Sequence, residues 1–408
     1  MAFIYSIGVR LYGLFVYLAS FFNDKAQKWV EGRRDWRTEL KLIPESENRI
    51  WVHCASLGEF EQALPIINEL EQQNFQVLVS FFSPSGFEHV KDKKRHSPIV
   101  YLPIDSKRNA KDFIQLIKPR FALFVKYEFW YFYWSELKKS NIPFYLISAV
   151  FRRNQIFFKS YGSWYKRVLE LPNHIFCQHI NSVNLLNEFG IKNSSYTGDT
   201  RYDRVLALTE NIDVNSALEK FSKNRKVIIA GSSWPIEEDL VIDYLNTRQD
   251  TYAIIAPHDV SNSHLKDITE KLNVPFVFYS KIDEFLHPDI RVVVVDTIGV
   301  LAKSYRYADI AIVGGGFTNA LHNILEPAAH GIPVITGNYT TKYTEAEMLE
   351  SAGGAIRINK DDFPVLMDNY FSDKELQIKM KEAAKLFVEK NAGATNKIID
   401  YLTLKSKI

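Results

Sequence analysis

The chain contains few cysteines and little net charge. Cys54 and Cys177 are the only cysteines among 408 residues, too few for a zinc cluster and without the spacing of a redox pair. This sparing use is typical of a reducing compartment, and we expect both thiols in the hydrophobic core. The formal net charge is only +2, so the molecule lacks the positive field that favours nucleic acids. We therefore expect no nucleic-acid partner.

A long uninterrupted apolar run is also missing, although the N-terminus comes close to one. Residues 2–22 are apolar and aromatic except for Arg10, which leaves about twelve uninterrupted residues where ~20 span a bilayer comfortably. No charged segment precedes this stretch and no clear cleavage site follows it, which argues against a signal peptide. The alternatives are a spanning helix, an interfacial helix, or a first helix that packs on the body.

A cluster of Lys and Arg between residues 25 and 41 follows the apolar stretch. Such a cluster is favoured on the cytoplasmic side, beside anionic headgroups. We therefore interpret residues 1–22 as a membrane anchor, with membrane lipids as partners and the rest of the chain facing the cytoplasm.

The length and the order of elements indicate two domains. A chain of 408 residues with 46% hydrophobic and 24% charged residues is globular and longer than one core usually supports. The polar segment 208–223 separates two series of elements. We predict a first domain over residues 23–210 and a second over residues 211–408, with the option that the last helix packs back on the first domain.

From residue 50 onward, short β-branched or aromatic runs alternate with longer amphipathic stretches, a pattern typical of parallel sheets covered by helices. Strands are predicted at 50–53, 77–81, 99–102, 121–125, 144–148, 174–177, 227–230, 253–256, 276–279, 291–295, 310–313 and 333–336. Helices are predicted at 59–72, 110–117, 131–139 and 374–391. The fold class is α/β, with two doubly wound domains whose ligands bind at the carboxyl ends of the strands.

The segment 51–59 predicts a strand that ends in small residues and opens a helix. Gly58 permits a tight turn, and Glu59 stands in the first helical turn. A carboxylate there can act as general base toward a hydroxyl. It can also merely complement the helix dipole, which first-turn acids often do.

A glycine triplet follows the strand predicted at 310–313. Backbone N–H groups of Gly314, Gly315 and Gly316 can approach a phosphate, with the positive end of a following helix behind them. Glu326, further on, can accept hydrogen bonds from ribose hydroxyls. Glycine also serves tight turns without any ligand, but the acidic residue at this distance favours a nucleotide site.

Two further strand ends carry polar residues. Ser232 and Ser233 precede a helix that they can cap or from which they can bind phosphate. His258 ends the next strand, where it can contact the nucleotide. In the first series, Glu128 and Trp130 end a strand in an aromatic stretch. Because burying Glu128 unpaired would be costly, it is either solvated in the cleft or paired with a base such as Lys126 or Arg152. The aromatics are either core or an apolar path for a lipid acceptor.

Through these residues the chain resembles, nearly end to end, the transferases that place 3-deoxy-manno-octulosonic acid (Kdo) on the lipid A precursor in lipopolysaccharide synthesis. The matching segments after the N-terminal anchor are Gly32 and Arg33 with Trp36, 53–59, 128–130, Ser148 and Ala149 with Arg152, 198–203, 231–238, 296–299 and 314–333. The chain departs from the family pattern at Lys126, Tyr127, His258, Asp259, Val300, Ala320 and Leu321.

The resemblance implies a GT-B fold, in which two Rossmann-like domains face a cleft, and an inverting, metal-independent transfer of Kdo from CMP-Kdo to lipid IVA without a cofactor. It implies Glu59 as catalytic base and Glu128 as an acceptor-side catalytic residue. The donor residues that it implies are Ser56, Gly58, Ser232, Ser233, His258, Gly314, Gly315, Gly316, Asn323 and Glu326, and the acceptor-side residues are Arg33, Trp130 and Arg152.

By the same resemblance, the protein belongs on the inner membrane, with its catalytic domains on the cytoplasmic face. One alternative is another GT-B transferase that uses a UDP- or GDP-sugar on a membrane lipid. A membrane-tethered nucleotide-binding or scaffold protein is a third reading, and it requires Glu59 and Glu128 to be dispensable.

Overall fold

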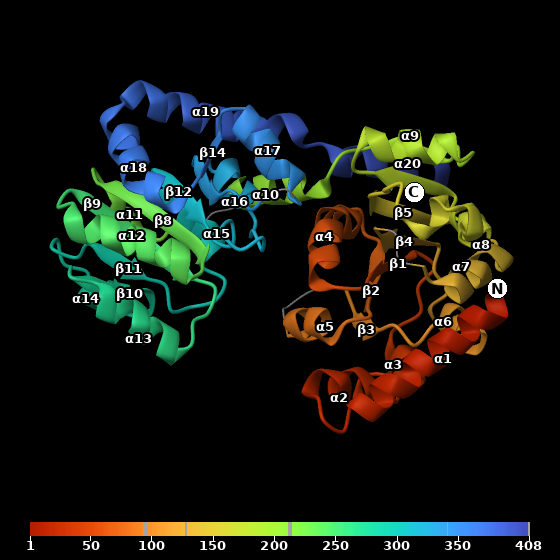
Figure 1. Cartoon of the computed structure of the whole chain (residues 1–408). Coiled ribbons are helices and arrows are strands. Elements are labelled where there is room, and N and C mark those ends of the chain that lie inside the picture. Colours follow the sequence, from red (N-terminus) through yellow and green to blue (C-terminus); the bar gives the residue numbers. More distant parts are fainter. Residues whose placement is uncertain (93–96, 127–128, 211–213, 341, 407–408) are drawn as a thin grey trace. The chain divides into compact units, whose positions relative to one another are not determined.

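The computed structural model describes residues 1–92, 97–126, 129–210, 214–340 and 342–406. The chain forms two compact units (Figure 1): Met1–Arg204 with Gly393–Ile408, and Val205–Ala392. The sequence placed the boundary at residue 210 and residues 393–408 in the second domain, with the option that the last helix packs back on the first domain. The chain instead leaves the first unit after Arg204 and returns to it at Gly393. The structure shows the packing of the last helix on the first domain, because its residues Ile398, Ile399 and Leu402 join a core layer of the first unit.

The first unit is built on a parallel sheet that has seven strands among the described residues, in the order β3-β2-β1-β4-β5-β6-β7. The strands are β1 Arg49–Cys54, β2 Gln76–Phe81, β3 Ile99–Tyr101, β4 Phe121–Val125, β5 Phe144–Ala149, β6 His174–Cys177 and β7 Ser194–Tyr196. β1 pairs with β2 on one side and with β4 on the other. The strand order therefore reverses between β1 and β4, where doubly wound sheets bind ligands.

Helices cover both faces of this sheet, so its central strands are mostly apolar on both faces. The helices are α1 Ala2–Ala19, α2 Asp24–Glu31, α3 Trp36–Leu42, α4 Leu57–Gln72, α5 Pro84–Lys91, α6 Lys107–Ile117, α7 Tyr131–Lys139, α8 Ser163–Leu169, α9 Ile180–Glu188 and α20 Ala394–Ser406, with 3-10 turns at Ile156–Phe158 and Ser160–Gly162. Cys54 and Cys177 are free and buried in the two core layers, as expected.

The second unit has a parallel sheet with the order β10-β11-β9-β8-β12-β13-β14 in the described part of the chain. Its strands are β8 Lys226–Ser233, β9 Thr251–Pro257, β10 Phe276–Phe278, β11 Val292–Val294, β12 Ile310–Val313, β13 Val334–Gly337 and β14 Ala355–Ile358. β8 pairs with β9 on one side and β12 on the other. The reversal between β8 and β12 is the corresponding ligand position of this unit.

The helices of the second unit also lie on both faces of its sheet. They are α11 Ser216–Ser222, α12 Pro235–Thr247, α13 Asn262–Lys271, α14 Ile282–Phe285, α15 Leu301–Ser304, α16 Leu325–Ala329, α17 Thr344–Ser351, α18 Phe363–Ser372 and α19 Lys374–Asn391, with 3-10 turns at Tyr279–Lys281, Tyr305–Tyr307 and Lys360–Asp362. α10, Thr200–Glu210, carries the chain from the first unit into the second.

Each predicted strand has a counterpart in the structure, and α19 has the predicted bounds. Two edge strands, β7 and β14, were not predicted. β7 reads Ser-Ser-Tyr and none of its residues is buried, so it lacks the apolar run by which the other strands were recognised. The parallel pairing of β7 with β6 creates the strand instead.

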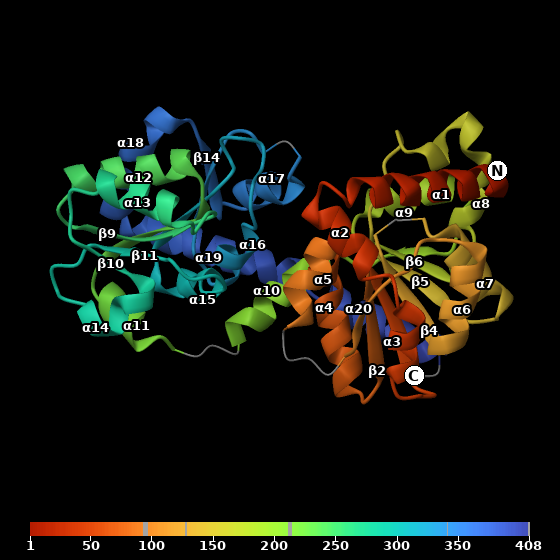
Figure 2. The same cartoon turned by 90° about the horizontal axis from the view of Figure 1, so that it is seen from below.

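α1 lies along the first unit, between α8 and α2 (Figure 2). Tyr5 packs against Trp164 of α8 at 5.8 Å, and Tyr12 packs against Trp29 of α2 at 6.0 Å between ring centroids. None of its residues is fully buried, and Phe3 and Phe15 are 76% and 65% exposed. Among the described helices, α1 alone is long and apolar enough to cross a membrane.

Candidate functional site

Glu59 lies at the strand-order reversal of the first unit. β1 ends at Cys54, and α4 begins three residues later with Glu59 in its first turn. Glu59 is only 5% exposed, and its Oε2 accepts a hydrogen bond of 2.6 Å from the backbone N–H of Ala55. Burial raises the pKa of Glu59, against the opposing effects of the Ala55 hydrogen bond and of Lys126, which follows β4. Such a carboxyl group can cap its helix, and its raised pKa also allows it to accept a proton.

Gly58 does not make the tight turn that the sequence predicted. It lies within α4 and has no positive φ. It is exposed, and a Cβ built on it would meet no atom within 4 Å. Neither backbone conformation nor packing requires glycine here, so the first turn of α4 offers bare backbone beside Glu59. Ser56, the N-cap residue, makes no capping hydrogen bond through its side chain.

His53 and Trp130 lie together at the same edge of the sheet. Nδ1 of His53 is 2.9 Å from Oγ of Ser80, and the imidazole meets the Trp130 ring edge to face at 4.7 Å. Burial lowers the pKa of His53 to about 3, so the ring is neutral at physiological pH. Trp130 also contacts Phe82. Trp130 therefore contacts His53 near the end of β1 and also lines a pocket beside α1.

Arg33, expected on the acceptor side, is buried in the first unit, where its side chain binds backbone carbonyl groups. Its guanidinium donates to the carbonyl oxygens of Leu102 (2.8 Å), Trp29 (2.9 Å) and Phe82 (2.6 Å). Burial lowers its pKa to about 9. Its neighbour Gly32 is required by packing, because a Cβ there would lie 2.2 Å from the Tyr101 ring. The Gly-Arg pair therefore ties α2 to the ends of β2 and β3.

Of the other predictions on the acceptor side, the structure describes Arg152 but not Glu128. Arg152 follows β5 and is exposed, with its backbone N–H bonded to Gln155. Glu128 lies outside the described residues, and its catalytic role stays a prediction.

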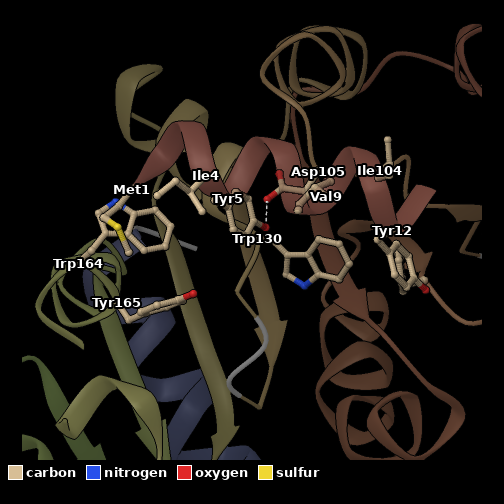
Figure 3. Close-up of a pocket in the computed structure, with 12 residues that line it drawn as sticks. Met1, Ile4, Tyr5, Val9, Tyr12, Ile104, Asp105, Trp130, Trp164 and Tyr165 are labelled. Carbon is tan, nitrogen blue, oxygen red and sulfur yellow. Dashed lines mark hydrogen bonds between the residues drawn. The ribbon is translucent and has the colours of Figure 1, made fainter. Parts of the chain in front are cut away.

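A pocket of about 390 Å³ lies between α1 and the carboxyl edge of the first sheet (Figure 3). It is lined by Met1, Ile4, Tyr5, Gly8, Val9, Tyr12, Phe82, Ile104, Asp105, Trp130, Trp164 and Tyr165. Asp105 is the carboxylate of this mostly apolar lining. It accepts hydrogen bonds from the Tyr5 hydroxyl (2.5 Å) and from the N–H groups of Phe132 and Tyr133 (3.2 Å each) at the start of α7. Burial raises the pKa of Asp105 to about 7.

In the second unit, the glycine triplet after β12 is required by the fold of the unit itself. A Cβ on Gly314 would lie 1.9 Å from the Ser232 oxygen, and one on Gly316 would lie 2.5 Å from the Gly337 nitrogen. Gly315 has φ +85°. The triplet therefore lets the ends of β8, β12 and β13 approach one another.

The backbone donors of this turn differ from the prediction. The N–H of Gly315 donates to Oε1 of Glu237 at 2.9 Å, so a buried carboxylate occupies the group expected to bind phosphate. The predicted helix also begins later than expected, because α16 starts at Leu325 after a loop. Asn323, in the loop before α16, donates from Nδ2 to Oε1 of Glu326 in the first turn of the helix at 3.1 Å.

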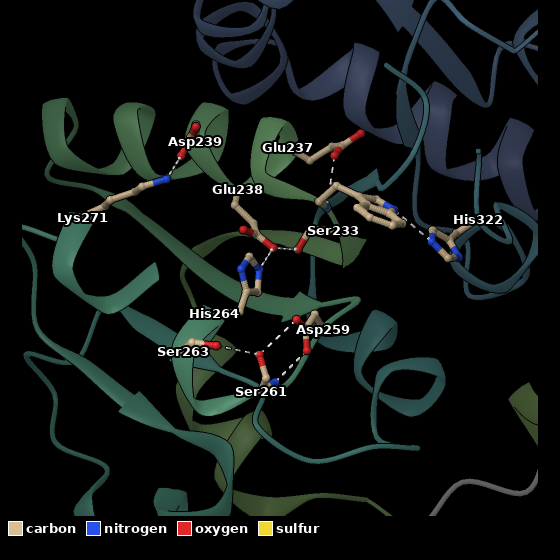
Figure 4. A network of polar contacts seen from close by, with 11 residues as sticks. Ser233, Glu237, Glu238, Asp239, Asp259, Ser261, Ser263, His264, Lys271 and His322 are labelled. Atoms are coloured by element: carbon tan, nitrogen blue, oxygen red, sulfur yellow. Dashed lines mark hydrogen bonds and ion pairs between the residues drawn. The ribbon is translucent and has the colours of Figure 1, made fainter. Parts of the chain in front are cut away.

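Ser232 and Ser233 do not cap α12, because its N-cap residue is Trp234. Ser233 is 1% exposed, and its hydroxyl donates to Glu238, which also pairs with His264 at 3.0 Å (Figure 4). Ser233 therefore supports the unit from inside. Ser232 is partly exposed and has φ +47°, a conformation that turns the chain at the end of β8.

His258 stands where the sequence placed it, at the end of β9. It stacks on Trp234 with 4.8 Å between ring centroids and an angle of 17° between the rings. His322, from the loop after β12, completes this group at 4.8 Å from His258. We call Trp234, His258 and His322 the ring stack. Trp234 and His322 were not among the predicted site residues, because only strand pairing brings them together.

No three His, Cys, Asp or Glu side chains form a group that could hold a metal ion in the part of the chain that the structure describes. The first unit gathers Ser56, Gly58, Glu59 and Trp130 at the carboxyl edge of its sheet. The second gathers its predicted donor residues at the equivalent edge.

Comparison with known proteins identifies the family. A family model described as 3-deoxy-D-manno-octulosonic-acid transferase (kdotransferase) matches residues 34–204. The 3-deoxy-D-manno-octulosonic acid transferase of Aquifex aeolicus is 30% identical over 352 residues, which cover 84% of this chain and 91% of that protein. The Haemophilus influenzae enzyme of the same name is 25% identical over 376 residues, 86% of each chain.

The fold has solved counterparts. UDP-GlcNAc 2-epimerase from Neisseria meningitidis superposes with a TM-score of 0.61 at 16% identity, covering 88% of this chain and 100% of that one. MurG from Acinetobacter baumannii gives a TM-score of 0.53 at 15% identity, covering 88% and 99%. Together with the two reversed parallel sheets, these likenesses show the GT-B fold. The chain belongs to the 3-deoxy-D-manno-octulosonic acid (Kdo) transferase family of glycosyltransferases.

Proposed function

We propose that this chain transfers Kdo from CMP-Kdo to lipid IVA, the lipid A precursor, with inversion at the anomeric carbon. The observation that carries the proposal is Glu59, a buried carboxylate at the strand-order reversal of the first sheet in a Kdo transferase. Burial raises its pKa toward the working pH, which suits a general base.

The chemistry follows from that position. Glu59 removes the proton from a glucosamine hydroxyl of the acceptor, and the oxygen attacks the anomeric carbon of Kdo from the face opposite the phosphate. The bond from that carbon to the phosphate oxygen breaks, and CMP leaves with the electron pair. We assign Glu128 an assisting role on the acceptor side.

The donor part of the proposal rests on the second unit. Ser232, His258, Asn323 and Glu326 lie at or just beyond the carboxyl ends of β8, β9 and β12, where a nucleotide would bind. Because Gly315 is bonded to Glu237, we assign phosphate binding to side chains more than to the glycine turn. We assign the leaving phosphate to the chain's own groups, and the scheme is written without a metal or cofactor, as the family resemblance implies.

The acceptor part of the proposal rests on α1. Its exposed face is apolar, and the pocket beneath it opens beside Trp130. We place α1 on the cytoplasmic face of the inner membrane, where the Lys and Arg residues after it meet anionic headgroups. The acyl chains of lipid IVA then lie on the same side as the pocket.

A transfer assay tests the proposal. Full-length protein in detergent is mixed with CMP-Kdo generated in situ and tetraacylated lipid A precursor, and the product mass is measured. We expect a gain of one or more Kdo units. UDP-GlcNAc as donor is the control, because a transferase of the alternative class would use it.

Thermal unfolding separates the two ways in which the assay can fail. A nucleotide that binds only the folded chain raises the thermal midpoint. If CMP raises it and no Kdo is transferred, the sugar or the acceptor is wrong. If UDP raises it and CMP does not, the donor itself is wrong.

A further inference from the structure

One hydrogen bond within the ring stack determines which ring nitrogen of His322 carries the proton. Nε1 of Trp234 lies 3.2 Å from Nε2 of His322. Figure 4 marks this contact by the dashed line that ends at the labelled His322. An indole N–H can only donate, so Nε2 of His322 accepts and carries no proton. The proton of the neutral imidazole is then on Nδ1, and no described residue accepts it.

The charges around His322 also favour the neutral ring. Burial lowers its pKa, and the neighbouring His258 lowers it further. The carboxylate of Glu237 is turned to the N–H groups of Gly315 and Trp234, and Glu326 accepts from Asn323. His322 therefore remains a neutral donor at physiological pH.

The backbone fixes where this donor lies. The N–H of His322 donates to the carbonyl oxygen of Gly314 at 3.0 Å, which folds the loop back on the glycine turn. The His322 backbone is thus held beside the glycine turn, and its ring lies against Trp234 and His258, which follow β8 and β9. Trp234 is 37% exposed and His258 is exposed, so a ligand can reach the stack.

We propose that Trp234 is a positioning residue that locks His322 in its Nδ1-protonated neutral form, so that Nδ1–H donates to the phosphate of the nucleotide donor. This inference rests on the proposed function for the identity of the ligand. A fixed N–H at the leaving phosphate stabilises the negative charge that develops there as the bond to Kdo breaks. His322 is then a catalytic residue and Trp234 acts through it.

The tautomer is read directly by nitrogen NMR of the full chain labelled with ¹⁵N-histidine. Protonated and unprotonated ring nitrogens have well-separated shifts, and His322→Gln identifies the His322 signals by their loss. We expect a protonated Nδ1 and an unprotonated Nε2 in the wild type. Trp234→Phe keeps an aromatic ring on His258 but removes the N–H, so His322 should revert to the Nε2-protonated form. Trp164→Phe, in the first unit, should leave the signals unchanged.

Addition of CMP or cytidine tests the ligand. CMP should shift the His322 Nδ1 signal, whereas cytidine, which has no phosphate, should not. Trp234→Phe should weaken CMP binding about fivefold or more, the effect of one hydrogen bond.

Three results would overturn the inference, each in its own way. An Nε2-protonated His322 in the wild type removes the role of Trp234, whatever the chain's activity. If CMP raises the thermal midpoint but does not shift the Nδ1 signal, His322 does not bind the phosphate. The proposed function is unaffected by that result. CMP that does not bind at all overturns the proposed donor and, with it, the phosphate contact.

Discussion

At the scale of single residues, a substitution of Glu59 distinguishes a role in helix capping from a role in catalysis. In Glu59→Gln the side-chain oxygen can still accept the Ala55 N–H, but the group can no longer take a proton. We expect an unchanged thermal midpoint and a loss of turnover of roughly 10²–10⁴, the range of general-base catalysis. The transfer assay measures this loss. Glu69→Gln on the same helix is the matched control, and full turnover in Glu59→Gln would leave Glu59 with capping alone.

At Gly58, one substitution should raise the stability of the chain and lower its activity. Ala in a helix is more favourable than Gly by about 1 kcal/mol, and a Cβ at this position meets no atom. Gly58→Ala should therefore raise the thermal midpoint slightly. If the donor approaches the bare backbone at Gly58, as the family resemblance implies, the methyl group should lower transfer at least about tenfold, or about 1.4 kcal/mol. A more stable variant with wild-type transfer would show that no ligand touches this turn.

Asp105 makes stability depend on pH. Its pKa is about 7 in the folded chain, against 3.8 ordinarily, so between these values the folded chain holds a proton that the unfolded chain has lost. The contribution of Asp105 to the free energy of unfolding is fully present below about pH 4. It falls by up to ~4 kcal/mol as the pH rises to about 7. The thermal midpoint of Asp105→Asn should rise relative to wild type across this window. A difference independent of pH would contradict the raised pKa.

At the scale of elements, α1 carries an exposed apolar face. Phe15 is 65% exposed, and placing a charge there opposes insertion into the lipid interface. Phe15→Glu should reduce binding to vesicles that contain anionic lipid at least about tenfold, because burying a Phe side chain contributes ~2–3 kcal/mol.

Val365 provides the matched control for this experiment. It is also 65% exposed but lies on α18 of the second unit. Val365→Glu should leave vesicle flotation unchanged. Equal losses in both variants would mean that α1 is not the membrane-binding element.

At the scale of the whole molecule, the C-terminus completes the first unit after the chain has built the second. Asp203 accepts hydrogen bonds from the N–H groups of Gly393 (2.5 Å) and Thr395 (2.7 Å) and thereby fixes the point of return. Leu402 on α20 is fully buried, whereas Leu404 is 80% exposed.

The two leucines test this return. Leu402→Ala should cost about 2–5 kcal/mol of stability, and Leu404→Ala should cost within about 0.5 kcal/mol. Thermal unfolding of both variants measures the difference. Equal midpoints would contradict the placement of α20 in the core of the first unit.

The sequence predicted the central strands of both sheets because parallel strands covered on both faces are apolar along their length. Its motifs also identified the family and placed Glu59 and His258 at strand ends. It misread the use of several glycines and serines. Gly58 leaves open space where a turn was predicted, Gly315 binds a carboxylate, and Ser233 faces the interior. A single residue type serves turns, packing and ligands alike, and only its neighbours in space decide which.

The sequence by itself determined the α/β class, the two series of elements, the apolar first helix and the family, since each depends on local periodicity or on motifs in order. Only the tertiary structure decided that residues 393–408 return to the first unit, that Asp105 binds Tyr5, and that Trp234 bonds His322. These depend on contacts between residues far apart in the chain, and no local pattern encodes such a contact. They form because parallel pairing brings the carboxyl ends of β8, β9 and β12 to one edge, and because the core of the first sheet stays incomplete until α20 covers it.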